Sequence, residues 1–214
     1  MKKLICFSLW GDDSTYTIGA IKNADLAKKH YPGWICRYYI ADCVPKNIID
    51  ELSNKDNVEI KEMGKGDWAA MFWRFYPASE SDVDVMISRD TDSRLNSREA
   101  AAVEEWLKSD KDFHIMRDHP FHATIILGGM WGVRGNLLSN MKNMIDEYTK
   151  GNFWQVDQNF LRENVWNVVK NCYISHDEYF EQKPFPTKRK PGLFIGQAFD
   201  KDDNKLNPEH GDML

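Results

Sequence analysis

The chain has 214 residues, a formal net charge of −5 and an aromatic content of 13%. This length suits one large domain, and the acidic balance argues against a nucleic-acid partner, because nucleic-acid binders usually carry a basic face. With no signal-like segment, no apolar stretch near the roughly 20 residues of a membrane span and four cysteines without metal-ligand spacing, we expect a soluble, cytoplasmic, single-domain protein over residues 1–214.

Hydrophobic periodicity predicts strands that alternate with helices along the chain. The expected strands are residues 3–10, 34–41, 57–62, 83–89, 112–117, 125–133 and 172–175. The expected helices are residues 17–30, 45–53, 67–76, 97–109, 137–149 and 155–169. Ser97 is the expected cap of the fourth helix, Pro77 the expected stop of the third, and residues 183–214 are expected to be mostly loop and tail. This alternation predicts an α/β fold with a mixed, largely parallel central sheet flanked by helices.

The segment ISRDTDSRL, residues 87–95, ends an apolar strand in two aspartates, Asp90 and Asp92. Open α/β sheets bind ligands at the carboxyl ends of strands, and alternate residues there point the same way. Two adjacent carboxylates repel each other unless a cation lies between them, and Mg²⁺ or Mn²⁺ often binds carboxylates together with substrate phosphates. Because arginines flank the pair, Arg89 among them, the segment predicts a metal–diphosphate site. The competing interpretation is a turn that caps a helix.

Three classes of enzyme use such a site: nucleotide-sugar glycosyltransferases, phosphatases with an aspartyl nucleophile, and nucleotidyltransferases. The D-x-D here follows about the fourth strand and not the first, which counts against a phosphatase. A nucleotidyltransferase usually has a Gly-rich phosphate loop early in the chain. The first strand here ends in SLWGDDSTY, residues 8–16, which is not such a loop and counts against that class. A non-enzymatic carbohydrate-binding module would also use aromatics and a divalent ion, but it would more often be β-rich, exported and disulfide-bonded.

The order of these motifs resembles the GT-A class of metal-dependent glycosyltransferases. Within that class it is similar to the first domain of a chlorella-virus enzyme that builds capsid-protein glycans. The segments that carry the likeness span most of residues 4–161: FSLWGDDSTYTIGAIKNA (7–24), MFWRFYPA (71–78), ISRDTDSRLNSRE (87–99), FHIMRDHPFH (113–122), ILGGMWGV (126–133) and VDQNFL (156–161).

The resemblance implies a Rossmann-like GT-A fold and a hexosyltransferase that uses Mn²⁺ or Mg²⁺. The implied donor is a nucleotide sugar, with a UDP-sugar expected, and the implied acceptor is a glycan or a glycoprotein. By association with the viral relative it also suggests capsid glycosylation and, for a virus-encoded chain, the host cytoplasm. The donor-binding residues that it implies are Ser8, Leu9, Trp10, Tyr16, Arg74, Arg89, Asp90, Thr91, Asp92, Gly128 and Gly129.

The resemblance also implies metal ligands and catalytic residues. Asp90 and Asp92 match the pair that holds the metal, and His210 is the one late candidate for a third ligand, although the longer signature expected around it is absent. Asp157 and Gln158 match a pair near the anomeric carbon in retaining relatives, which favours a retaining reaction. For an inverting reaction the segment RDHPFH, residues 117–122, offers Asp118, His119 and His122 as bases. A polar turn before Pro120 is the alternative for this segment.

Overall fold

The computed structural model describes all 214 residues and contains one seven-stranded sheet in the order β3-β2-β1-β4-β6-β5-β7. The strands are β1 (Lys3–Leu9), β2 (Ile35–Ile40), β3 (Val58–Glu62), β4 (Val85–Ser88), β5 (Phe113–Arg117), β6 (Trp131–Arg134) and β7 (Tyr173–Asp177). Only β6 runs antiparallel to its two neighbours, β4 and β5. The predicted mixed, largely parallel sheet is therefore confirmed.

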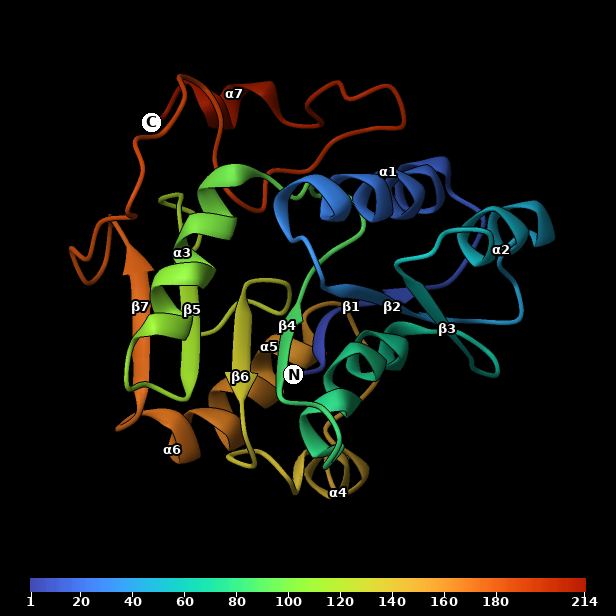
Figure 1. Cartoon of the computed structure of the whole chain (residues 1–214), viewed down its shortest axis with the longest axis horizontal. Coiled ribbons are helices and arrows are strands. Elements are labelled where there is room, and N and C mark those ends of the chain that lie inside the picture. Colours follow the sequence, from blue (N-terminus) through green and yellow to red (C-terminus); the bar gives the residue numbers. More distant parts are fainter.

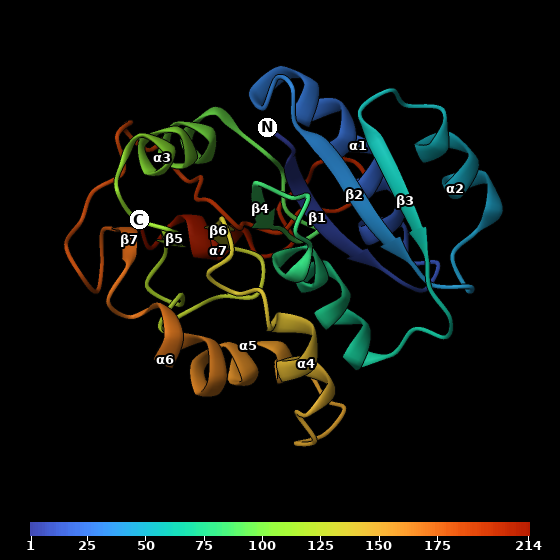
Figure 2. The ribbon, with the colours of Figure 1, turned by 60° about the horizontal axis from the view of Figure 1, so that its bottom comes forward.

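Helices cover both faces of this sheet (Figure 1). The helices are α1 (Ser14–His30), α2 (Lys46–Ser53), α3 (Ser97–Lys108), α4 (Met141–Asp146), α5 (Val156–Phe160), α6 (Trp166–Val169), α7 (Pro208–Gly211), the 3₁₀ helix η1 (Trp68–Ser79) and the π-helical turn η2 (Leu161–Val165), which joins α5 to α6. Figure 2 shows α1, α2 and α3 on one side of the sheet and α4, α5 and α6 on the other. The molecule thus has three layers.

The alternation of side chains along β1 explains how the two layers of helices are held. Leu4 and Cys6 pack into a cluster with residues of η1, α4 and α5, whereas Ile5 and Phe7 pack into a second cluster with residues of α1, α2 and α3. Successive residues of a strand point to opposite faces, so a strand buried on both faces reads as a continuous apolar run. The sequence KLICFSL has this character.

Two helix boundaries differ from the prediction because of hydrogen bonds made by their caps. The side chain of Asp13 accepts a hydrogen bond from the Thr15 amide at 2.8 Å, so α1 begins three residues earlier than expected. The cap of α3 is Asn96 and not Ser97. Its Oδ1 accepts from the amides of residues 98 and 99 at 3.0 and 3.1 Å. Both arrangements satisfy backbone donors that a helix start leaves free.

Three further segments depart from the predicted elements. The helix predicted over residues 137–149 is shortened to α4, Met141–Asp146. The predicted strand over residues 125–133 is reduced to β6, because the Gly128–Gly129 segment leaves the sheet and lies against two carboxylates described below. The third helix continues through Pro77 as 3₁₀ turns and not as an α-helix that stops before it. Within it, the amide of Arg74 donates to Ser8 Oγ at 3.2 Å, which ties η1 to the end of β1.

The segment after β7 is mostly loop, and it is bonded to the rest of the protein. It crosses above the upper ends of the strands in Figure 1 and includes α7. The amide of Phe199 donates to the carbonyl of Asp92 at 2.9 Å, and Arg94 Nε lies 2.8 Å from Asp203 Oδ1. These contacts place the segment beside the D-x-D motif.

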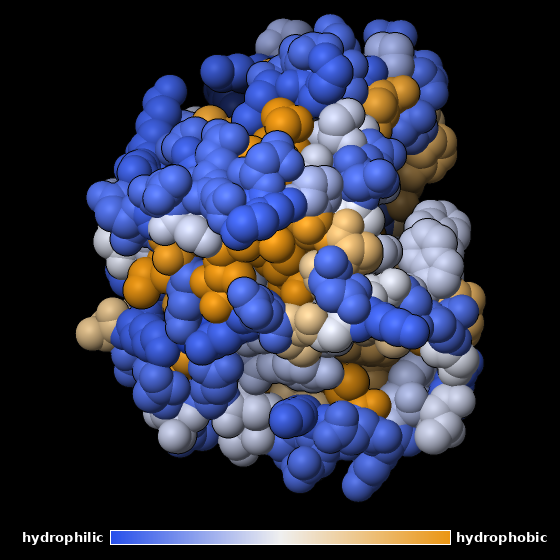
Figure 3. Space-filling view, turned by 90° about the vertical axis from the view of Figure 1, so that its right-hand side faces the viewer, coloured by the Kyte–Doolittle hydropathy of each residue, from blue (hydrophilic) through white to orange (hydrophobic).

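The opposite edge of the sheet is formed by β3. Figure 3 shows this side, where an apolar strip crosses a largely polar surface. Val58 and Ile60 of β3 are half-buried here and pack against the cluster under α1 and α2.

None of the helices in the structure is both long enough and apolar enough to cross a bilayer.

Two histidines are buried together between β5 and β7. His114 Nε2 lies 2.8 Å from His176 Nδ1, and the ring of His114 stacks on Trp106 with centroids 5.3 Å apart. Burial, with the nearby His176 and Arg89, holds the pKa of His114 well below its usual 6.5. Burial also lowers the pKa of His176. Both rings are therefore neutral in the folded protein near neutral pH.

The stability of the protein should fall as the pH falls below the pKa of an unfolded histidine, about 6.5. Below that pH the unfolded chain binds protons that the folded chain excludes, so each buried neutral histidine costs up to ~1.4 kcal/mol per pH unit. Urea unfolding of the wild type and His114→Phe between about pH 7.5 and 5.5 tests this. The free energy of unfolding of the variant should depend less steeply on pH, and equal slopes would contradict the assignment.

Candidate active site

A cavity of about 470 Å³ opens at the carboxyl ends of β1 and β4. These two strands are neighbours in the sheet. From β1 the chain adds β2 and β3 on one side, and from β4 it adds the later strands on the other side, so the strand order reverses between β1 and β4. Ligands of open α/β sheets bind at such a reversal of strand order. The predicted site residues that line the cavity are Ser8, Leu9, Trp10, Tyr16, Arg74, Asp90, Thr91, Asp92, His122, Gly128, Gly129, Asp157 and Gln158.

Arg74 forms ion pairs with two carboxylates of the cavity, those of Asp90 and Asp157. Its Nη2 lies 2.8 Å from Asp157 Oδ2, and its Nη1 pairs with Asp90 Oδ1. The guanidinium is buried, and the side chain of Asp157 is 1% exposed. Burial raises the pKa of Asp157, although Arg74 opposes the shift. Residues 74, 90 and 157, which the sequence offered as separate candidates, are thus one ion-paired unit.

The remaining predicted arginine does not reach the cavity. Arg89 is buried and turned the other way, with its Nε 3.1 Å from Glu99 Oε1 and its Nη1 2.7 Å from the carbonyl of Ser88. Neighbouring residues at a strand end point to opposite sides, so Arg89 and Asp90 cannot both face the ligand. Arg94 and Arg98 are also engaged elsewhere, with Asp203 and Asp118. Arg74 is therefore the single guanidinium in the cavity wall.

Asp118 and His119 have other partners than a substrate. Asp118 is fully buried, and its carboxylate is paired with Arg98 at 3.0 Å and Arg189 at 2.6 Å. Nδ1 of His119 accepts from the amide of Phe121 at 3.1 Å, and its Nε2 lies 3.0 Å from the carbonyl of His210. Neither residue lines the cavity. Both residues therefore hold neighbouring parts of the chain together, and the structure does not bring them to the candidate catalytic residues of the cavity.

The late histidine is also outside the cavity lining. His210 belongs to α7, and its ring packs edge-on against Phe121 with centroids 5.0 Å apart. No group of three His, Cys, Asp or Glu side chains is arranged to hold a metal. The structure therefore does not bring His210 together with the D-x-D pair.

The two glycines of the cavity are explained by the carboxylates beside them. A Cβ on Gly128 would collide with Asp157 Oδ2 and lie 2.6 Å from Arg74 Nη2. A Cβ on Gly129 would lie 2.5 Å from Asp90 Cγ. Only residues without a side chain allow this backbone to pass so close to both carboxylates.

Gly129→Ala should therefore push Asp90 out of place and destabilise the fold by about 1–3 kcal/mol, the usual cost of overpacking. A matched control is Gly64→Ala, because a Cβ on Gly64 meets no atom within 4 Å. Urea unfolding of both variants measures the difference. Equal stability of the two variants would show that the D-x-D loop yields freely to the added methyl group.

The cavity is strongly acidic. Five carboxylates line it, against the one guanidinium of Arg74: Asp12, Asp13, Asp90, Asp92 and Asp157. Burial and the neighbouring charge of Asp90 raise the pKa of Asp92 to about 7. A diphosphate would be repelled from such a surface unless a cation accompanied it. Hard carboxylate oxygens suit Mg²⁺ or Mn²⁺, which take further ligands from water and phosphates, so the residues present fit a divalent cation on Asp90 and Asp92.

Several cavity residues were missed by sequence reasoning. Trp68 meets Trp10 edge-on with ring centroids 6.4 Å apart, and Trp154 is 66% exposed at the rim. Gln155 also lines the cavity and has a left-handed backbone with φ 67°, which is uncommon for a residue other than glycine and often marks a functional site. Asp12 and Asp13 could have been predicted, because they come just after the first strand, following Trp10 and Gly11, and ligands of open α/β sheets bind at the carboxyl ends of strands.

No protein-family model matches the amino-acid sequence, and no curated protein matches it significantly. Solved structures do match. A glycosyltransferase involved in the glycosylation of the major capsid of PBCV-1 is 17% identical, with all of each chain covered and a TM-score of 0.58. The galactosyltransferase LgtC, in complex with donor and acceptor sugar analogues, is 10% identical over 83% of this chain and 74% of its own, with a TM-score of 0.53.

A third similar structure is glucosyl-3-phosphoglycerate synthase from Mycobacterium tuberculosis in complex with UDP. It is 8% identical over 88% of this chain and 72% of its own, with a TM-score of 0.53. At such identities the likeness concerns the fold. It confirms the predicted GT-A, Rossmann-like fold and the structural resemblance to the viral capsid glycosyltransferase.

Proposed function

We propose that this chain is a glycosyltransferase that moves a sugar from a nucleotide-sugar donor to a glycan or protein-linked acceptor. The observation that carries the proposal is the position of Asp90 and Asp92 in an acidic cavity, at the point where the strand order of a GT-A-like sheet reverses. A cavity with this charge accepts a diphosphate only together with a cation, and the two carboxylates are suited to hold Mn²⁺ or Mg²⁺. When bound, the cation offsets charge on the leaving diphosphate.

A UDP-sugar is the proposed donor. The end of β1 and the rim provide flat rings for a nucleobase, and the half-exposed Tyr16 and Trp10 both line the cavity. Aromatic faces stack on such rings. The solved complex of a similar fold with UDP supports this choice of base.

Asp157 and Gln158 are the proposed catalytic residues. The reacting sugar carbon becomes positively charged as its bond to the diphosphate breaks, and a carboxylate next to it stabilises that charge. Asp157 is held in place by Arg74 and lies in the same wall as Asp90. A fixed, buried carboxylate needs little reorganisation during the reaction. We propose a retaining outcome, with Asp157 on the reacting face.

The acceptor is proposed to bind in a second cavity of about 230 Å³. It shares Leu127, Gln155 and Gln158 with the first cavity, so the two meet beside the proposed catalytic residues. Phe121, 60% exposed, lines it and offers an apolar ring to a sugar face. A glycan, free or on a protein, has the matching chemistry, and the fold likeness to a capsid glycosyltransferase suggests a capsid glycan.

Release of UDP from a panel of UDP-sugars in Mn²⁺, with candidate glycan acceptors, tests the function. The wild type should release UDP from one donor, and Asp157→Asn should release it at least about 100-fold more slowly. The anomeric configuration of the product, read by NMR, distinguishes retention from inversion. Binding of free sugar without nucleotide would indicate a lectin instead, and release of phosphate from simple phosphate esters would indicate a phosphatase.

A further inference from the structure

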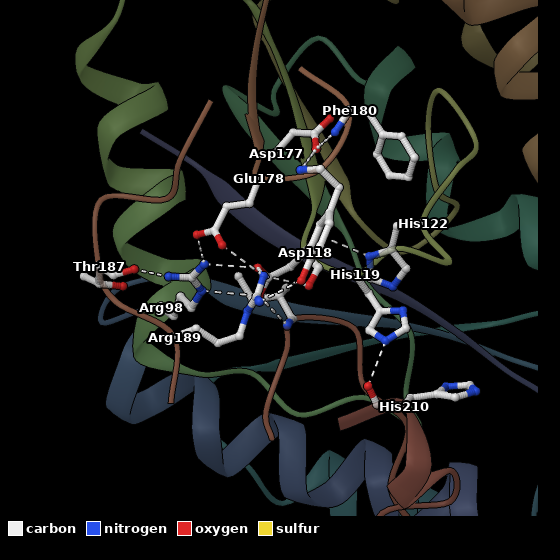
Figure 4. Close-up of polar contacts among 12 residues, drawn as sticks. Arg98, Asp118, His119, His122, Asp177, Glu178, Phe180, Thr187, Arg189 and His210 are labelled. Carbon is white, nitrogen blue, oxygen red and sulfur yellow. Dashed lines mark hydrogen bonds and ion pairs between the residues drawn. The ribbon is translucent and has the colours of Figure 1, made fainter. Parts of the chain in front are cut away.

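Two histidines of the segment after β5 differ in their hydrogen bonds (Figure 4). Both ring nitrogens of His119 have backbone partners. Its Nδ1 accepts from the Phe121 amide, and its Nε2 lies beside the His210 carbonyl, a contact that Figure 4 draws. The ring of His122 has a single partner: its Nδ1 accepts from the amide of Asp118 at 3.1 Å. An amide can only donate, so Nδ1 of His122 carries no proton. In the neutral ring the proton is therefore on Nε2.

The donor that fixes this tautomer is itself held rigidly. The carboxylate of Asp118 receives Arg98 and Arg189, and its Oδ2 accepts from the amide of Ile195 at 3.0 Å. Figure 4 shows Arg98 of α3 and Arg189 of the segment that follows β7 converging on Asp118. Gly196, the residue after Ile195, lines the cavity together with His122.

Nε2 of His122 is free to meet a ligand. No group of the chain forms a hydrogen bond with this nitrogen, and it is not sealed inside the protein. In this it differs from Nδ1 of His114 and Nε2 of His176, which are buried without a partner. The residue lines the main cavity. Burial lowers the pKa of His122 to about 4, and His119 contributes to the shift, so the ring is neutral near neutral pH.

We propose that His122 is a neutral N–H donor from Nε2 to an oxygen of the bound nucleotide sugar, and that it is not the general base of the reaction. The identity of this ligand rests on the proposed function. A protonated Nε2 has no lone pair with which to accept a proton from an acceptor hydroxyl. The oxygen that it meets belongs either to the diphosphate or to a hydroxyl of the sugar.

Long-range ¹H–¹⁵N NMR spectra of the histidine side chains test the tautomer directly, without nucleotide and without activity. The expected pattern for His122 is a protonated Nε2 and an unprotonated Nδ1 at neutral pH. The His122→Gln variant assigns the signal by its disappearance. A protonated Nδ1 would overturn the inference while leaving the proposed function untouched.

Two substitutions separate the roles of the two nitrogens. Asparagine has an amide oxygen near the position of Nδ1 but no donor at the position of Nε2, whereas the longer glutamine carries its amide nitrogen near Nε2. His122→Asn should weaken ligand binding about tenfold, and His122→Gln should stay within about threefold of the wild type. Calorimetric titrations of UDP, UDP-glucose and UDP-galactose in Mn²⁺ measure this, with melting temperatures as a check on folding.

The outcomes are distinct. Weaker binding of UDP and UDP-sugars alike by His122→Asn assigns the hydrogen bond to the diphosphate, and weaker binding of a UDP-sugar alone assigns it to the sugar. Unchanged affinity in His122→Asn overturns the inference. A loss of about 10²- to 10⁴-fold in kcat in both variants, with unchanged affinity, would identify His122 as the base. Failure of the wild type to bind any of these nucleotides would remove the proposed function together with this ligand.

Discussion

The substitution Asp118→Asn should lower the free energy of unfolding by about 3–5 kcal/mol. Asp118 is fully buried, and its carboxylate is the shared partner of Arg98 and Arg189. Asparagine keeps the shape but removes the negative charge, so two largely buried guanidiniums lose their buried anionic partner and keep only the partly exposed Glu178. The effect should extend to the segment after β7, because Ile195 and Arg189 of that segment bond to the same carboxylate.

A matched control for this prediction is Glu178→Gln. Glu178 contacts the same two arginines at 2.6 and 3.1 Å, but its side chain is 31% exposed. Water replaces part of what is lost at such a site, so the expected cost is about 1 kcal/mol or less. Chemical denaturation of both variants measures the difference. Equal losses would show that the burial of Asp118 is not what makes it important.

The second large effect concerns function and not stability. Asp92→Asn should weaken Mn²⁺-dependent binding of UDP by at least about 100-fold, because even outer-shell changes at metal sites cost about 10- to 100-fold. The fold should keep its stability or gain some. Asp92 is a partly buried carboxylate beside Asp90, and burial and that repulsion raise its pKa to about 7. Replacing a buried carboxylate that is repelled by its neighbour commonly raises the stability of the fold while it lowers activity or binding.

The control for charge alone is Asp12→Asn. Asp12 lines the same cavity but lies after β1 and outside the D-x-D pair. This variant removes one negative charge from the cavity, so UDP should bind as well as in the wild type or slightly better. Titrations in Mn²⁺ compare the two variants. If Asp12→Asn and Asp92→Asn weakened binding equally, the effect would be a general one of charge and not one of metal coordination.

The parts of the structure that the sequence predicted are those set by local pattern. The strand that ends at Ser88 is a buried apolar run followed by polar residues, and this pattern predicted Asp90 at the carboxyl end of the sheet, whereas Ser8 was implied by the resemblance. Spacing also predicts that Asp90 and Asp92 share a direction. Both line the cavity in the structure, as do Asp157 and Gly129, which resemblance and motif order supplied.

The parts that the sequence did not predict depend on partners far away along the chain. Asp118 pairs with Arg189, 71 residues later, and no local pattern indicates that pairing. The engagement of Arg89 with Glu99 likewise follows from packing of α3 on the sheet and not from the charge pattern. The Gly128–Gly129 segment reads as a strand by composition, yet two carboxylates from other elements press against it.

The measurement that tests the central claim most directly is a calorimetric titration of UDP into the wild-type chain, first with Mn²⁺ and then with EDTA, with GDP and TDP for comparison. A metal-dependent nucleotide site built on Asp90 and Asp92 predicts binding of UDP with Mn²⁺, loss of that binding in EDTA, and preference for UDP over the other two nucleotides. Absence of binding in both conditions, or equal binding with and without metal, would contradict it.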